Sequence, residues 1–225
     1  MMALAVAAIA TAGFGFAWQD ILDDASRPEA ERKRDAGSKP LQVYAFFGVE
    51  EGMTVIDLAP GAGYNTFLLS KIVGDSGRVI AGPDRRGSVQ QRLDDAGDAM
   101  ANVTVMSDMG SLEPASVDVI VTVRNVHDFE NGGRAAGIYA AALAALKPGG
   151  IFGVVDARTP KEGFDNSTHR INEQMVIDHV TTAGFELVES SDLLANPDDD
   201  FGKYEGMGSR VEVDRMVLKF RKPIS

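Results

Sequence analysis

The stretch from Met53 to Leu69, M-T-V-I-D-L-A-P-G-A-G-Y-N-T-F-L-L, decides the fold class. Thr54 to Leu58 is a short apolar run rich in β-branched residues, which predicts a buried strand because it is too short for a helix. Ala59 to Gly63 predicts a tight turn, and Tyr64 to Val73 returns to helical spacing. A strand, a glycine turn and a helix begin a βαβ unit, whose ligands bind where the strand ends.

The rest of the chain alternates short apolar runs with helical segments, which favours an α/β fold with a parallel sheet. Helices are predicted after Pro28 and over Pro40 to Phe47, Arg134 to Leu146 and Ile171 to Ala183. Further strands are predicted over Gly77 to Ala81, Asn102 to Met106, Val117 to Val123, Ile151 to Asp156, Phe185 to Ser190 and Met216 to Phe220.

The length, net charge and absence of cysteine limit the possible domain organisation, binding partners and chemistry of the chain. The 225 residues suit one domain with a sizeable core, and 44% of them are hydrophobic, as in ordinary globular proteins. The net charge of -11 repels a phosphate backbone, so nucleic acid is not an expected partner. Cysteine is absent, which excludes disulfides and thiolate chemistry.

Two motifs carry a family resemblance. V-I-D-L-A-P-G-A-G resembles motif I of class I S-adenosylmethionine (SAM) dependent methyltransferases, usually D-x-G-x-G-x-G. Asp57, Gly61 and Gly63 fall on that pattern, and Ala59 replaces its first glycine. A-L-K-P-G-G before the strand at Ile151 resembles a second motif of the same enzymes, in the right order. The nicotinamide-type G-x-G-x-x-G is not met, which disfavours an oxidoreductase.

The resemblance implies a doubly wound, Rossmann-like sheet of seven strands, mostly parallel with an antiparallel C-terminal strand. It also implies SAM as cofactor, with its methionine end over the glycine turn. Asp84 is a weak candidate for the ribose hydroxyls, and Asp108 beside Met109 fits the adenine position. The expected cofactor contacts are therefore Asp57, Ala59, Gly61, Gly63, Asp84, Asp108, Met109 and Asn125.

The chemistry is expected at Arg124-Asn125-Val126-His127-Asp128-Phe129, on a loop after the fourth strand. His127 is the candidate base, and Asp128 the group that orients it or holds the substrate. Loop capping by His127 is the structural alternative. His169 and Arg170 are candidate anchors for an anionic substrate. His127, Asp128 and His169 could together hold a metal, but no H-E-x-x-H or comparable spacing supports this, so no metal site is predicted.

The N-terminus resembles an export signal. Met1 to Ala17 is uncharged and apolar and ends in small residues, but lacks a positive start. We expect its removal or membrane embedding, with no stable span after processing, and one domain over Trp18 to Ser225 with capping helices over Trp18 to Glu50. An apolar helix docked on the domain is the alternative. The protein would then be periplasmic or secreted, with the cytoplasm as alternative because SAM is made there.

A closer resemblance joins four further segments to a bacterial family of predicted methyltransferases that commonly carry signal peptides. The segments are S-R-P-E-A-E-R-K-R-D, R-N-V-H-D-F, T-H-R-I-N-E and S-D-L-L-A-N-P-D-D-D. The resemblance implies methyl transfer to a small-molecule or peptide acceptor that the sequence does not identify, and it leaves the oligomeric state open. A non-catalytic SAM or nucleoside binding module on the same fold is the alternative.

Overall fold

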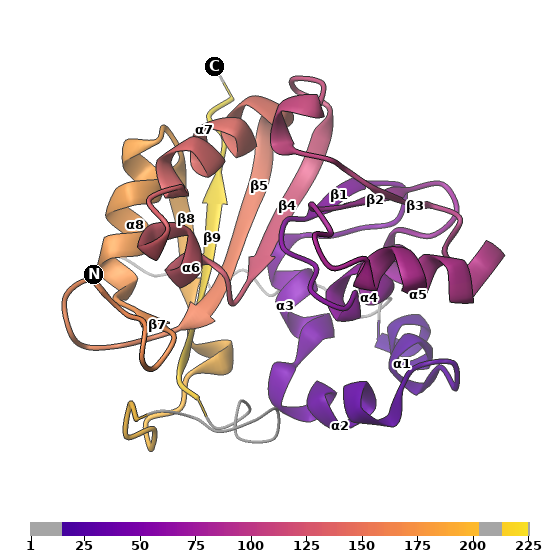
Figure 1. The fold of residues 1–225 in the computed structure, drawn as a ribbon, viewed down its shortest axis with the longest axis horizontal. Helices are drawn as coiled ribbons and strands as arrows, with labels where there is room; N and C mark the ends of the chain where they lie inside the picture. The colour runs from indigo at the N-terminus through magenta and orange to yellow at the C-terminus, as the bar shows by residue number, and fades with distance from the viewer. Residues whose placement is uncertain (1–14, 203–212, 225) are drawn as a thin grey trace, which may run out of the picture.

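The computed structural model describes residues 15–202 and 213–224, which form a seven-stranded sheet flanked by helices (Figure 1). The strand order is β3-β2-β1-β4-β5-β9-β8. The first five strands in this order are parallel, whereas β9 is antiparallel to both of its neighbours. The strands are β1 (Thr54–Asp57), β2 (Arg78–Ala81), β3 (Val103–Val105), β4 (Val117–Val123), β5 (Leu146–Ala157), β8 (Glu186–Ser191) and β9 (Arg215–Arg221).

The two faces of the sheet bury separate apolar clusters, because successive side chains of a strand point to opposite sides. Ile56 of β1 belongs to one cluster and its neighbour Val55 to the other. The first cluster is covered by α6 (Val126–Asn131), α7 (Ala135–Ala145) and α8 (Glu173–Thr182). The second is covered by α1 (Gly15–Asp23), α3 (Pro40–Phe47), α4 (Tyr64–Val73) and α5 (Ser88–Ala96). Both faces of the central strands are therefore covered by helices, and polar side chains collect at the strand ends.

The predicted fold is confirmed: the sheet is Rossmann-like, mostly parallel, and its antiparallel last strand lies between β5 and β8. The predicted elements over Tyr64 to Val73 and Val117 to Val123 have the observed bounds of α4 and β4. Three differences concern local structure. Lys147 to Gly150 continues β5 rather than preceding it, and Arg170–Ile171 is a strand, β7, that pairs with β6 (Phe164–Asp165) ahead of α8.

The third difference concerns the run that carries the candidate catalytic residues. His127 and Asp128 were expected on a loop, but they lie in the first turn of α6. Asn125 precedes this helix as its N-cap residue. The helix is short, and Val126 and Phe129 anchor it in the apolar core. The local geometry at the end of β4 is therefore more rigid than a loop would be.

The helices before β1 pack on the domain. α2 (Glu29–Ser38) has no buried residue, but the Tyr64 hydroxyl of α4 donates a hydrogen bond to Asp35 of α2 at 2.7 Å. The Tyr44 hydroxyl of α3 donates to Asn65 of α4 at 2.8 Å. These bonds fix α2 and α3 next to the helix that follows the glycine turn. No helix within residues 15–202 and 213–224 is long and apolar enough to cross a membrane.

Most of the predicted export signal, residues 1–14, lies outside the described residues. The predicted processing point after Ala17 lies within α1. Trp18, Ile21 and Leu22, which follow that point, pack against the apolar cluster beneath α4. A chain that begins near Trp18 would therefore keep these core contacts.

Candidate functional site

A cleft of about 540 Å³ lies between the turn after β1 and the end of β4. The helix α2 closes it on the side of the N-terminal helices, through Glu31 and Arg34. The lining residues are Glu31, Arg34, Ala59, Pro60, Gly61, Ala62, Tyr64, Asn65, Arg86, Val123, Arg124, Asn125, His127, Asp128 and His169. The cleft therefore joins the two stretches that the sequence analysis assigns to cofactor and to chemistry.

The glycine turn presents Gly61 to this cleft. Gly61 has a φ of +58°, a conformation that glycine adopts without strain, and an added Cβ there would meet nothing within 4 Å. Gly63 differs, because its added Cβ would lie 2.9 Å from Arg92 Cδ. The helix α4 begins at Tyr64 with no side-chain cap, and an uncapped helix N-terminus is a favourable position for a negatively charged group of a ligand.

Asp57 ends β1 and is fully buried beneath the turn rather than lining the cleft. The Thr66 hydroxyl donates to its Oδ2 at 2.7 Å, while Oδ1 has no hydrogen-bond partner among the described residues. Burial raises the pKa of this carboxyl to about 6, although the hydrogen bonds from Thr66 act in the opposite direction. A buried acceptor without a partner is costly to stability.

His127 is held by Asp156 at the end of β5. The residue is 5% exposed, and Nδ1 lies 2.9 Å from Asp156 Oδ1. The backbone N–H groups of His127 and Ala157 also donate to this carboxylate. Since a carboxylate only accepts hydrogen bonds, Nδ1 carries the proton and Nε2 is the atom left for chemistry. Burial opposes a charge on the ring, but the hydrogen bond and charge of Asp156, with Asp128 adding, raise the pKa of His127 above 6.5.

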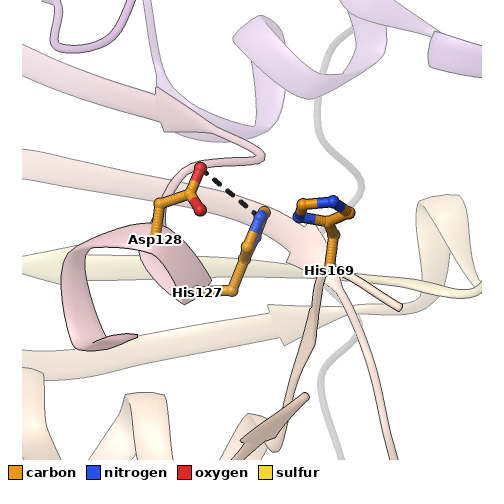
Figure 2. A group of neighbouring side chains, drawn as sticks. All are labelled: His127, Asp128 and His169. Atoms are coloured by element: carbon orange, nitrogen blue, oxygen red, sulfur yellow. Dashed lines mark ion pairs between the residues drawn. The ribbon is translucent and has the colours of Figure 1, made fainter. Parts of the chain in front are cut away.

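Asp128 and His169 flank the exposed side of His127 (Figure 2). Asp128 Oδ2 lies 3.6 Å from His127 Nε2, and the His169 ring meets the His127 ring edge-on with centroids 5.5 Å apart. Asp128 and His169 are both exposed. Asn125 Nδ2 donates to Val123 O at 2.7 Å and lies 3.5 Å from Ala59 O, so it spans the end of β4 and the glycine turn.

Several predicted site residues lie apart from this cleft. Asp84 accepts hydrogen bonds from the backbone of Ser88, Val89 and Gln90. Desolvation would raise its pKa, but these bonds outweigh it and lower the pKa. Asp108 is exposed and Met109 half-buried, in the turn after β3, two strands from β1. Arg170 is 1% exposed and donates to Asp199 at 2.7 Å, so only His169 of the predicted anchoring pair lines the cleft.

Asp156 and the basic residues around the cleft were not predicted as site residues from the sequence. Asp156 ends the apolar run of β5, next to β4, and an acid at that sheet edge could have been found from the strand order. Arg34 lies over the Tyr64 ring at 4.0 Å. Arg34 and Arg124 also approach the buried Arg215, whose pKa falls to about 10 through burial and then through their charges. Positive charge therefore collects beside the cleft in an acidic protein.

Comparison with known proteins identifies the fold. No protein-family model and no curated protein sequence matches the chain. A SAM-dependent methyltransferase structure from Aquifex aeolicus matches with a TM-score of 0.65 at 21% identity, over 92% of this chain and 100% of that one. The 1,6-didemethyltoxoflavin-N1-methyltransferase of Burkholderia thailandensis, with bound S-adenosylhomocysteine, matches with a TM-score of 0.59 at 17% identity, over 91% and 82%.

A third structure extends the comparison beyond methyl transfer. The [4+2]-cyclase SpnF matches with a TM-score of 0.62 at 16% identity, over 84% of this chain and 82% of that one. The chain shares the fold of these proteins. Because identities are this low and one neighbour is a cyclase, the shared fold leaves the reaction to be argued from the site.

Replacing Asp57 by asparagine is expected to raise the free energy of unfolding above pH 6, by up to about 3 kcal/mol. The folded carboxyl keeps its proton up to about pH 6, whereas the unfolded one loses it near 3.8, so wild-type stability falls as pH rises between these values. The variant lacks this penalty and retains an oxygen for Thr66. Urea unfolding of the ligand-free protein between pH 4 and pH 8 measures the difference.

Asp84→Asn is the matched control for this experiment. The pKa of Asp84 is lowered in the folded state, so its carboxylate stabilises the protein above its unfolded pKa and loses this effect as pH falls. The control should therefore lose stability at neutral pH, opposite to Asp57→Asn. A pH-independent difference between Asp57→Asn and wild type would mean that Asp57 does not ionise with a raised pKa.

Proposed function

We propose that the chain is a SAM-dependent methyltransferase that acts on a small-molecule or peptide acceptor. One observation carries the proposal: a single cleft joins the glycine turn after β1 to His127 and Asp128 after β4. Ligands of doubly wound sheets bind at this edge, so the cofactor and the acceptor would meet there. The methyltransferase structures with the same fold support this assignment.

The residues present fit SAM. The cleft has the volume of an ordinary small-molecule site, roughly 300–1,000 Å³, and Gly61 leaves its turn open to a ligand. The buried Asp57 oxygen behind the turn, which has no hydrogen-bond partner among the described residues, is a costly polar group that a functional role would explain. In this proposal the methionine end lies in the cleft over Ala59 to Gly63, and the adenine extends beyond the cleft toward Asp108 and Met109, with Asp84 nearest the ribose.

The chain's own part in the reaction is positioning and proton removal. When bound, SAM supplies an electrophilic methyl group on a sulfonium. That methyl group would pass to an acceptor lone pair, with the sulfonium sulfur keeping the electron pair of the broken carbon–sulfur bond as the leaving group. His127 Nε2 takes the acceptor proton, Asp156 holds the ring, and Asp128 and His169 flank the acceptor.

The proposal also covers the narrower family, the cellular compartment and the kind of acceptor. The segment resemblances favour the bacterial family with signal peptides, hence a periplasmic or secreted enzyme, although SAM supply favours the cytoplasm. The net charge of -11 argues against a nucleic-acid acceptor. Fold neighbours act on chemically distinct acceptors, didemethyltoxoflavin in one case and arsenic(III) in another, which is consistent with an acceptor set by local residues.

Gly61→Val is expected to abolish SAM binding, measured by calorimetry on the folded variant. The valine side chain would project into the space that the ligand needs, at a position where the backbone is already left-handed. Gly133→Val is the matched control: Gly133 has a φ of +62° with nothing within 4 Å of its added Cβ, but it does not line the cleft. If Gly61→Val binds SAM as tightly as Gly133→Val does, the ligand does not lie over this turn.

His127→Ala should leave SAM affinity nearly unchanged and lower turnover by roughly 10²–10⁴-fold. The wild-type rate should rise with pH through a value above 6.5, because the base must lose its proton first and its pKa is raised. Asp156→Asn should move that limb to lower pH, since it removes the negative charge that raises the pKa. Mass spectrometry of extracts incubated with labelled SAM identifies the acceptor for these assays.

Each result has a distinct meaning for the role of His127. Loss of the pH limb in His127→Ala supports a base, whereas a raised KM with an unchanged profile supports positioning alone. Unchanged activity per folded molecule would remove both roles and leave only the capping function. SAM binding without any methylated product would favour the non-catalytic binding module.

A further inference from the structure

The side chains of His127, Asp128 and His169 converge on one point at the cleft (Figure 2). One ligand-type atom from each of the three lies within 4.8 Å of the other two, and His127 Nε2 lies 3.6 Å from Asp128 Oδ2. A tetrahedral zinc ion with bonds of about 2.0–2.1 Å holds its ligand atoms roughly 3.3 Å apart. Small side-chain rotations would therefore bring all three onto one ion.

His127 already has the hydrogen bonding of a metal ligand. Asp156 accepts the Nδ1 proton at 2.9 Å, which fixes the ring orientation and leaves the Nε2 lone pair directed at Asp128. A carboxylate behind the ligating histidine is the usual support of such a ligand, since it also increases the basicity of the ring. Asp156 is itself held by two backbone N–H groups, so this support is rigid.

His169 is held against His127 although its side chain is exposed. Its backbone has a φ of +53°, which is uncommon for residues other than glycine, and its ring meets the His127 ring of α6 edge-on. Asn166 Nδ2 donates to Asn131 Oδ1 of α6 at 2.8 Å, and the neighbouring Arg170 is anchored on Asp199. The segment that carries His169 is thus tied to the helix that carries the other two ligands.

The donor set indicates the class of ion. Two imidazoles and one carboxylate suit Zn²⁺, Co²⁺, Ni²⁺ or Fe²⁺ better than Mg²⁺ or Ca²⁺, which prefer oxygen alone. The carboxylates of Asp128 and Asp156 supply negative charge, which the positive charge of Arg124 opposes in part. We propose that His127, Asp128 and His169 hold one divalent transition cation at the mouth of the cleft.

Three protein ligands leave open positions on such an ion, as in catalytic rather than structural zinc sites. An acceptor oxygen or a water bound there would lose its proton more easily, so in the metal-bound form the ion would activate the acceptor in place of His127 Nε2, whose lone pair is then occupied. This consequence rests on the proposed methyl transfer, whereas cation binding does not. No metal motif is visible in the sequence because His169 comes from a distant segment, which the fold brings next to α6.

The test uses the full chain, free of any histidine tag and of bound metal, titrated with Co²⁺ and then Zn²⁺. We expect one Co²⁺ per chain with the visible absorption of a low-symmetry nitrogen and oxygen site, displaced by Zn²⁺. His169→Asn should abolish it, since asparagine tolerates the left-handed backbone without supplying an imidazole. Asp156→Asn should weaken binding about 10–100-fold.

His179→Asn is the matched control, because His179 is the chain's third histidine and pairs with Glu130 on α6, outside the cleft. It should bind Co²⁺ like the wild type. Absence of a stoichiometric Co²⁺ spectrum in the wild type, or equal binding by His169→Asn and His179→Asn, would overturn the site. His169 and Asp128 are exposed, so Asp128→Asn gives a second folded variant.

Calorimetry with SAM on the same samples separates this proposal from the proposed function. Co²⁺ binding without SAM binding would retain the cation site and reject the methyltransferase. SAM binding with methyl transfer, but without a Co²⁺ site, would retain the enzyme and reject the cation.

Discussion

The candidate site depends on one constraint, the burial of both faces of a parallel sheet. Because β1 to β5 run parallel and helices cover each face, polar side chains are accommodated where the strands end. The glycine turn follows β1, Asn125 to Asp128 follow β4, and Asp156 ends β5. Three adjacent strands thus deliver their polar ends to one edge, and the cleft forms between them.

Asp156 and Asp57 are both buried at this edge of the sheet, but their hydrogen bonding differs. Asp156 accepts N–H groups from His127 and Ala157, so its burial is compensated and it positions a ring. Asp57 has one oxygen satisfied by Thr66 and one without a partner among the described residues. The first arrangement stabilises a site residue, and the second keeps an uncompensated acceptor beside the glycine turn. An uncompensated buried acceptor of this kind lowers the stability of the ligand-free protein.

The fold followed from local patterns because short β-branched runs and glycine turns specify elements without distant contacts. The strand and helix around the glycine turn, and β4, were predicted within one residue of their observed bounds. Features that depend on tertiary contacts were not predicted from the sequence. His127 and Asp128 lie in α6 because Val126 and Phe129 anchor that turn in the core, and Asp156 had been treated only as the end of a strand.

His169 and Arg170 show the same limit at the scale of neighbouring residues. Both were predicted to anchor one anionic substrate, but His169 lies in a turn with a left-handed backbone whereas Arg170 begins β7, so their side chains point to different surroundings. Arg170 turns inward to the buried Asp199, and His169 turns toward the cleft. Without the β6–β7 pairing, nothing in the sequence distinguished the two orientations.

The electrostatics of the cleft also differ from those of the whole chain. A long polyanion would contact much of the protein surface, so the net charge of -11 argues against nucleic acid as a binding partner. The cleft itself combines Arg34, Arg86 and Arg124 with Glu31 and Asp128. A small ligand interacts mainly with these nearby charges, because salt screens exposed charges that lie more than about 8–10 Å away at physiological ionic strength. A carboxylate at this position, such as the one SAM carries, is therefore compatible with an acidic protein, and net charge does not restrict the acceptor to cations.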